Sequence, residues 1–157
     1  MYERLLCLAN KESKRKLLIS QGDKLKWGIV GTGQIANKFI KALVESSSQN
    51  HHVVAIASSS DLKKAHTLKE KFEKISDICY CYGSYAELCA DKNVDVVYIA
   101  TPHSLHFRDA LQALNFGKNV IIEKCFTLNK KEAEILIQKA KEKGLFIMEA
   151  MWTRFLN

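Results

Sequence analysis

Residues Leu25 to Asn37 read L-K-W-G-I-V-G-T-G-Q-I-A-N, a short apolar run that leads into a glycine-rich turn and then into helical spacing. Gly31 and Gly33 lie two residues apart and Ala36 follows three later, the pattern G-x-G-x-x-A of a dinucleotide-binding turn. Each position needs a small residue. Gly31 lets the chain turn out of a strand, Gly33 lets a pyrophosphate approach the backbone, and Ala36 lets the helix pack close to the sheet.

The start of the following helix has the geometry that a phosphate needs. Its first N–H groups, around Gln34 and Ile35, would point toward the ligand together with the positive end of the helix dipole. The motif alone is not specific, because Gly-x-Gly also closes ordinary turns between a strand and a helix. The remaining sequence has to separate these alternatives.

Length and composition indicate one globular domain. The chain has 157 residues, of which 47% are hydrophobic, so it can bury a core but is too short for two domains of normal size. The longest apolar stretches are strand-sized, such as Val94 to Ala100, and none approaches a membrane span. The N-terminus has no signal-peptide pattern, so we expect a cytoplasmic protein without a membrane partner.

The positive charge gathers at the N-terminus. Of the net +7, residues 1–26 carry +4, from seven Lys/Arg against three acids. Such an extension could touch nucleic acid or an acidic membrane surface. Because it lacks interleaved aromatic residues, we favour a solvated tail over residues 1–24 that binds no nucleic acid.

The five cysteines indicate free thiols. Their number is odd and their spacing shows no paired loops, which fits a reducing compartment. Cys79 and Cys81 form C-x-C, not the C-x-x-C of a zinc knuckle. We therefore expect buried or edge thiols and no metal site.

Apolar runs of strand length alternate with helical spacing along the chain. Strands are predicted at residues 25–30, 53–57, 78–82, 94–100, 119–123 and 145–149. Helices are predicted at residues 34–47, 61–72, 84–90, 105–116 and between Asn129 and Gly144. His51 and His52 are expected in an exposed loop. The alternation predicts an α/β fold, a doubly wound parallel sheet (Rossmann) of six strands.

Helix ends have recognisable signals. Asp61 is a candidate N-cap, and Asn129 with Glu132 resembles a capping box. Gly117 and Gly144 stand where left-handed C-terminal caps are needed. These residues predict where three of the helices begin or end.

In a doubly wound sheet, ligands bind outside the carboxyl ends of the strands. The residues predicted at that edge are the glycine-rich turn, Ser58 to Ser60, Thr101 to His106, and Glu123 to Cys125. These segments are therefore the candidate binding residues.

The turn after the second strand favours NADP over NAD. An acid at this point usually holds the ribose diol of NAD, and a basic residue meets the 2′-phosphate of NADP. The sequence has Ser58, Ser59 and Ser60, followed by Lys63 and Lys64. Hydroxyls and amines can hold a phosphate, so NADP is expected, with NAD possible.

Four motifs in order resemble one family. They are G-T-G-Q-I-A after the first strand, I-A-T-P-H-S-L-H after the fourth, E-K-C where the family has E-K-P, and M-E-A-M-W-T-R-F after the sixth. Together they resemble the N-terminal half of the Gfo/Idh/MocA oxidoreductases, and within it the group of dimeric dihydrodiol dehydrogenases and NADP-dependent D-xylose dehydrogenases. The resemblance covers residues 25–157.

This resemblance implies NAD(P)-dependent hydride transfer between the cofactor and a diol, polyol or aldose. It makes Lys124 the candidate catalytic residue, beside the nicotinamide, where an amine can stabilise developing charge on the reacting oxygen. Without the resemblance, Lys124 would be read as a surface lysine after a strand. Further cofactor contacts are implied for Thr101, Pro102, His103, His106, Glu123, Trp152 and Arg154.

Cys125 departs from the family pattern. The family proline there often follows a cis bond, and a cis bond costs roughly 2.5 to 4 kcal/mol before other residues, against about 0.5 to 1 kcal/mol before proline. We therefore expect Lys124 to be either trans and displaced, or held under strain.

The resemblance also predicts domain organisation. It divides the chain into an extension (1–24), a cofactor-binding domain (25–150) and the start of a link (151–157) to a second, α+β substrate domain absent from these residues. That domain would supply the acid/base residue and the homodimer interface of a full-length form. For 157 residues alone we expect cofactor binding without appreciable turnover; the alternative is a non-catalytic dinucleotide-binding module.

Overall fold

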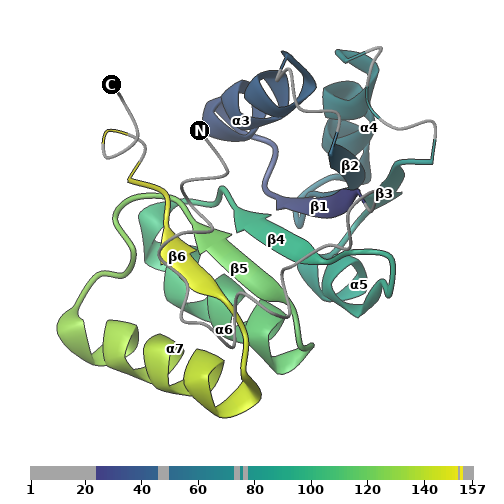
Figure 1. The fold of residues 1–157 in the computed structure, drawn as a ribbon. Helices are drawn as coiled ribbons and strands as arrows, with labels where there is room; N and C mark the ends of the chain where they lie inside the picture. Colours follow the sequence, from purple (N-terminus) through teal and green to yellow (C-terminus); the bar gives the residue numbers. More distant parts are fainter. Residues whose placement is uncertain (1–23, 46–49, 73–74, 76–77, 152, 154–157) are drawn as a thin grey trace.

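The computed structural model describes residues 24–45, 50–72, 75, 78–151 and 153. The basic extension expected over residues 1–24 and the link expected over 151–157 fall almost entirely outside the described residues. The described part is built on one six-stranded sheet (Figure 1).

All neighbouring strands of the sheet are parallel, and their order is β3-β2-β1-β4-β5-β6. The strands are β1 (Leu25–Val30), β2 (His51–Ala57), β3 (Tyr80–Tyr82), β4 (Val96–Ile99), β5 (Asn119–Ile122) and β6 (Ile147–Glu149). The strand order reverses direction between β1 and β4, which is the switch point of a doubly wound sheet. The predicted fold class is confirmed.

Helices cover both faces of the sheet (Figure 1). They are α3 (Gln34–Glu45), α4 (Leu62–Glu70), α5 (Tyr85–Ala90), the short 3₁₀ helix η2 (His103–Leu105), α6 (His106–Asn115) and α7 (Lys130–Lys143). Apolar residues of α3 and α4 belong to one core cluster, and those of α5, α6 and α7 to a second one on the opposite face. The four inner strands β1, β2, β4 and β5 are therefore largely buried on both sides, which explains their nearly continuous apolar sequences.

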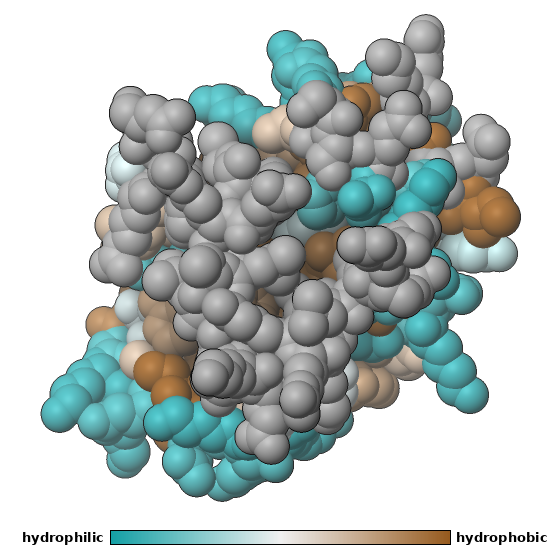
Figure 2. All heavy atoms as spheres, in the orientation of Figure 1, coloured by the Kyte–Doolittle hydropathy of each residue, from teal (hydrophilic) through white to brown (hydrophobic). Residues whose placement is uncertain are grey.

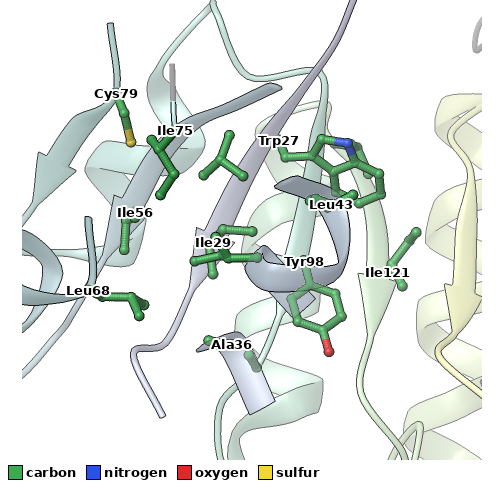
Figure 3. Packing of buried hydrophobic residues seen from close by; sticks show 14 of the residues in the cluster. Trp27, Ile29, Ala36, Leu43, Ile56, Leu68, Ile75, Cys79, Tyr98 and Ile121 are labelled. Atoms are coloured by element: carbon green, nitrogen blue, oxygen red, sulfur yellow. The ribbon is translucent and has the colours of Figure 1, made fainter. Parts of the chain in front are cut away.

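An aromatic group anchors α3 to the sheet (Figure 3). Trp27 and Tyr98 are each 1% exposed. The Phe39 ring stacks on Tyr98, with centroids 3.6 Å apart, and meets Trp27 edge-on at 5.2 Å. Because Phe39 comes from α3, these contacts fix the helix over β1 and β4, at the switch point.

The two histidines before the second strand are not in an exposed loop. His51 and His52 are the first residues of β2 and are half-buried. Trp27 Nε1 donates a hydrogen bond to His51 Nδ1 over 3.2 Å. Burial, and secondarily the nearby His52, lower the pKa of His51. The strand was predicted from its apolar residues alone. His51 and His52 extend the strand but are not apolar, so the prediction left them out.

The strand predicted at 78–82 begins only at Tyr80. The strands predicted at 94–100 and 145–149 also begin later than expected, because their first residues still bond to the preceding helix or turn. The Val94 N–H donates to the Asp91 carbonyl, and the Leu145 N–H to that of Ala140. Apolar side chains at these positions enter the core without joining the sheet. The apolar run is thus longer than the strand.

The predicted caps are present. Asp61 is the N-cap of α4 and Asn129 that of α7, where the Asn129 side chain accepts from the Glu132 N–H over 3.0 Å. Glu132 accepts from Leu128 rather than from the cap residue, so the box is only half formed. Gly144, with φ of 61°, forms the left-handed C-cap of α7.

The outer surface of α7 is mostly hydrophilic (Figure 2), although Ile135 and Ile137 are also exposed on this helix. It carries ion pairs between Lys130 and Glu134 and between Lys139 and Glu142. Within the described residues, no helix combines the length and the hydropathy needed to cross a bilayer.

Gly31 lies where β1 and β4 come closest. Its φ is +100°, and a Cβ built on it would lie 2.7 Å from the Ala100 carbonyl oxygen. A side chain at this position would need both a strained backbone and a displaced β4. The end of β1 can therefore approach β4 only because residue 31 is glycine.

We predict that Gly31→Ala lowers the free energy of unfolding by about 1 to 3 kcal/mol, the cost of one residue held in a disfavoured conformation. Urea denaturation measures the change. Gly83→Ala is the control, because a Cβ there meets no atom within 4 Å. Its stability should stay within about 0.5 kcal/mol of the original chain. Equal free energies of unfolding for the two variants would contradict the requirement for glycine at position 31.

Candidate functional site

A series of main-chain hydrogen bonds runs across the carboxyl edge of the sheet. The donors are the N–H groups of Ser58, Gly31, Ala100, Glu123 and Ala150, each bonded to the end of the next strand along the edge. The edge therefore holds all the segments predicted to bind a ligand. Since neighbouring strands lie about 4.8 Å apart, the end of β1 and the end of β5 are about 10 Å apart.

The glycine-rich turn opens toward solvent. Gly33, Gln34 and Ile35 are exposed, whereas Ala36 is buried against the sheet. The first intrahelical bond runs from the Asn37 N–H to the Gly33 carbonyl, 3.2 Å. The N–H groups before it have no partner within the helix, and a Cβ at Gly33 would meet nothing within 4 Å. Open space before free N–H groups suits a pyrophosphate.

Thr101 lies beside this turn, at the end of β4. It is 6% exposed, and its Oγ1 atom has no hydrogen-bond partner within the described part of the chain. A buried hydroxyl without a partner costs free energy unless a ligand or water bonds to it. The orphaned hydroxyl therefore fits a polar ligand bound at the switch point.

The serine turn after β2 forms a second polar group on the same edge. Ser58 is buried and lies 3.4 Å from Ser60 between hydroxyl oxygens, while Ser59 is exposed. The Lys64 amine donates to the Ser60 hydroxyl over 3.3 Å. The nearby Asp61 carboxylate accepts from the Lys63 N–H as the cap of α4, so it is already engaged.

Glu123 is held on both carboxylate oxygens. The Tyr98 hydroxyl donates to its Oε1, and the Lys124 N–H donates to its Oε2 over 3.2 Å. Glu123 is 7% exposed, and Tyr98 is itself fixed by its stack on Phe39. A buried carboxylate with donors on both oxygens has a fixed orientation. Sequence reasoning did not identify Tyr98, whose aromatic ring reads as an ordinary core residue.

Lys124 is exposed at this edge, and among residues with described positions none forms a hydrogen bond or ion pair with its amine. Lys118 shows the contrast at the opposite end of β5. It is buried, and its amine donates to the Asp91 and Val94 carbonyls over 2.6 and 2.7 Å. Burial lowers the pKa of Lys118. The Lys118 amine is thus engaged by carbonyl groups of the fold, whereas the Lys124 amine is available to a ligand.

The peptide bond between Lys124 and Cys125 is cis, so the expectation of a displaced trans bond is wrong. Cys125 is exposed. Of the other thiols in the described ranges, Cys79 and Cys89 are buried and Cys81 is half-buried. Burial raises the pKa of Cys79 and of Cys89 to about 12. The described residues contain no cluster of three His, Cys, Asp or Glu side chains that could hold a metal ion.

The two histidines after β4 differ in position. Pro102 and His103 are exposed, at the start of η2. His106 is fully buried, with Nε2 2.9 Å from the Thr101 carbonyl and Nδ1 2.7 Å from that of Cys125. Both ring nitrogens face main-chain carbonyls, so His106 contacts these two loops and has no free nitrogen for a direct contact with the cofactor.

Trp152 and Arg154 lie outside the described residues. Glu149, a few residues earlier, was not predicted as a site residue although it stands at the end of β6. Its Oε1 accepts from the Phe126 N–H over 2.8 Å, in the loop that follows Lys124. The rule that ligand sites gather at the carboxyl ends of strands could have identified it.

The family assignment follows from comparison with known proteins. Residues 25–151 match the Gfo/Idh/MocA family model, described as an oxidoreductase family with an NAD-binding Rossmann fold. This match covers most of the chain, and the chain belongs to that family. The resemblance inferred from the four motifs is confirmed.

Two curated relatives illustrate the similarity. The chain is 47% identical over 137 residues to a D-xylose 1-dehydrogenase (NADP(+)) of Hypocrea jecorina, covering 83% of this chain and 35% of that protein. It is 44% identical over 131 residues to a trans-1,2-dihydrobenzene-1,2-diol dehydrogenase of Mus musculus, covering 83% of this chain and 38% of that one. The chain thus spans little more than a third of the relatives' length.

Solved structures show the same fold. A 3-ketoreductase from Actinomadura kijaniata, KijD10, in complex with TDP-benzene and NADP superposes with a TM-score of 0.73 at 31% identity, over 81% of this chain and 38% of that one. An NAD binding oxidoreductase from Klebsiella pneumoniae superposes with a TM-score of 0.70 at 28% identity, over 81% and 34% of the two chains.

Proposed function

We propose that this chain is the cofactor-binding part of an NADP-dependent dehydrogenase that acts on the CH–OH group of a diol, polyol or aldose. One observation carries the proposal: the glycine-rich turn and Lys124 lie on the same edge of the sheet, two strands apart and on either side of β4. An extended dinucleotide laid along that edge would meet both. The relatives named above act on a sugar and on a diol, which supports the substrate class.

Different residues of this edge would contact different parts of the cofactor. The N–H groups at Gln34 and Ile35 would hold the pyrophosphate, close to the Gly33 backbone. The unpartnered Thr101 hydroxyl would bond to the nicotinamide side of the cofactor. Glu123 is already oriented by Tyr98 and would present Lys124, or the ribose hydroxyls, in a fixed direction.

The chemistry assigned to this chain is electrostatic. The nicotinamide supplies the hydride acceptor or donor when it is bound. The Lys124 amine extends from the edge, unengaged in the described structure, and would stabilise negative charge on the reacting oxygen. The proton of the substrate hydroxyl would pass to a base that is not among the residues described here.

The serine turn supports NADP rather than NAD. Hydroxyls of Ser58 and Ser60 and the Lys64 amine form one polar cluster at the end of β2, and Ser59 lies exposed beside it. This cluster suits the 2′-phosphate, since cationic donors bind phosphate oxygens strongly. The carboxylate that would prefer a ribose diol, Asp61, is occupied as a helix cap.

The wider setting is part of the proposal. Five cysteines with no disulfide spacing fit a cytoplasmic protein. For a full-length form we propose a homodimer, as the resemblance implies, with a sugar or diol as its small-molecule partner. Lys124, Trp152 and Arg154 would then lie toward the substrate side of the cofactor.

Titration of the 157-residue chain with NADPH, followed by nicotinamide fluorescence, tests the proposal. We predict saturable binding that Gly33→Ala weakens at least tenfold, because a methyl group would occupy the space that a phosphate needs. The melting temperature should stay nearly unchanged, since the added Cβ meets no protein atom within 4 Å.

Gly83→Ala is the matched control, because its Cβ is equally unopposed and the residue follows β3, two strands away from the turn that would hold the pyrophosphate. It should bind NADPH as the original chain does. Absence of NADPH binding by the original chain, or equal binding by the Gly33 and Gly83 variants, would refute the proposed function.

The serine turn gives a second prediction. Lys64→Ala should weaken NADPH binding about tenfold, the effect of losing one charge-assisted hydrogen bond, and leave NADH binding unchanged. Lys71→Ala is the control, at the exposed opposite end of α4. A similar loss of NADH affinity, or the same effect in both lysine variants, would rule out a 2′-phosphate contact at Lys64.

A further inference from the structure

We propose that Glu149 is a positioning residue for Lys124, and that His106 acts with it by holding the neighbouring peptide. The inference deepens the proposed function and rests on it. It concerns the loop of residues 124–126, which leaves the end of β5 at the ligand edge. Neither residue would touch the substrate; both would act through the main chain of this loop.

Side chains from two other elements hold consecutive parts of this loop. Glu149, at the end of β6, accepts from the Phe126 N–H through Oε1 over 2.8 Å. His106, at the start of α6, contacts the Cys125 carbonyl through Nδ1 over 2.7 Å. The loop is therefore held from two sides, by the end of β6 and by the start of α6.

The side-chain contacts that hold this loop begin at Lys124. Its N–H donates to the Glu123 carboxylate over 3.2 Å, so the residue before it supplies the first contact. Three successive residues thus each have a main-chain group bonded to a side chain. Lys124 itself keeps an exposed side chain. With its backbone fixed on both sides, the point from which the flexible lysine side chain leaves the edge is fixed.

Glu149 is well placed to transmit this constraint. It pairs with Ile122 in the β5–β6 ladder, and the next residue, Ala150, donates to the Ile122 carbonyl over 2.7 Å. The backbone of Glu149 is thereby locked to the strand that carries Lys124. From this fixed position its carboxylate reaches forward to the Phe126 N–H.

His106 links the same loop to the switch point. Its other nitrogen, Nε2, lies 2.9 Å from the Thr101 carbonyl, next to the orphaned Thr101 hydroxyl. A carbonyl oxygen only accepts hydrogen bonds, and a neutral imidazole donates at one nitrogen only, so the neutral ring hydrogen-bonds one of these carbonyls and lies in contact with the other. One buried ring thus couples the Cys125 peptide to the end of β4, where the nicotinamide side of the cofactor is proposed to lie.

The test compares two ligands: NADPH, and 2′-phospho-ADP-ribose, which is NADP without its nicotinamide. Glu149→Ala removes the acceptor for the Phe126 N–H. We expect it to weaken NADPH binding about fivefold, the loss of one hydrogen bond, and to leave 2′-phospho-ADP-ribose binding unchanged. Glu149→Gln keeps an acceptor oxygen and should restore NADPH binding. Glu134→Ala, an exposed acid on α7, is the control.

The dependence on Lys124 is tested in a double-mutant cycle. In the Lys124→Ala background, Glu149→Ala should have no further effect on NADPH binding. Equal weakening of both ligands by Glu149→Ala, unchanged NADPH binding, or simple additivity with Lys124→Ala would overturn the positioning role. If the original chain binds neither ligand, it is the proposed function that fails.

Hydrogen exchange keeps the inference testable should Glu149→Ala fail to fold. In the original chain the Phe126 amide should exchange at least tenfold more slowly than the exposed amide of Lys131, because it is held by Glu149. Exchange at equal rates would overturn the proposed grip on the loop.

Discussion

The close approach of β1 to β4 is the constraint on which the structure depends. Gly31 adopts a φ of +100° and leaves no room for a Cβ against the Ala100 carbonyl. The Ala100 N–H in turn donates to Val30, so the two strand ends are locked where the sheet changes direction. This contact opens the start of α3 toward solvent on one side and places Thr101 on the other, which creates the ligand edge.

The site combines rigid support with unfilled donors. Glu123 is bonded on both oxygens and Tyr98 is stacked on Phe39, so the supporting residues have no freedom left. Two polar groups have no partner within the described structure: the buried Thr101 hydroxyl and the exposed Lys124 amine. Such an arrangement is preorganised, because the supporting groups are already oriented before a ligand binds.

The features that depend on local sequence pattern could be predicted from the sequence alone. Apolar runs predicted the six strands, and the glycine-rich turn at Gly31 predicted a dinucleotide site after the first of them. Contacts between distant residues could not be predicted: His51 joins β2 because Trp27 bonds to it, and His106 is consumed by two carbonyls from different loops. Glu149 could have been identified as the last residue of a predicted strand, but its bond to the Phe126 N–H could not, because only the folded β5–β6 pair brings it to the loop after Lys124.

The central claim is that the glycine-rich turn and the Lys124 loop share one cofactor. NMR titration of the ¹⁵N-labelled chain with NADPH tests it most directly. The account predicts that the amide signals of Gly33 to Ala36 and of Lys124 to Phe126 shift together with one dissociation constant. The amide signals of Gly117 and Gly144, at the opposite edge of the sheet, should not shift. Shifts in only one of the two loops, or shifts centred on Gly117 and Gly144, would contradict it.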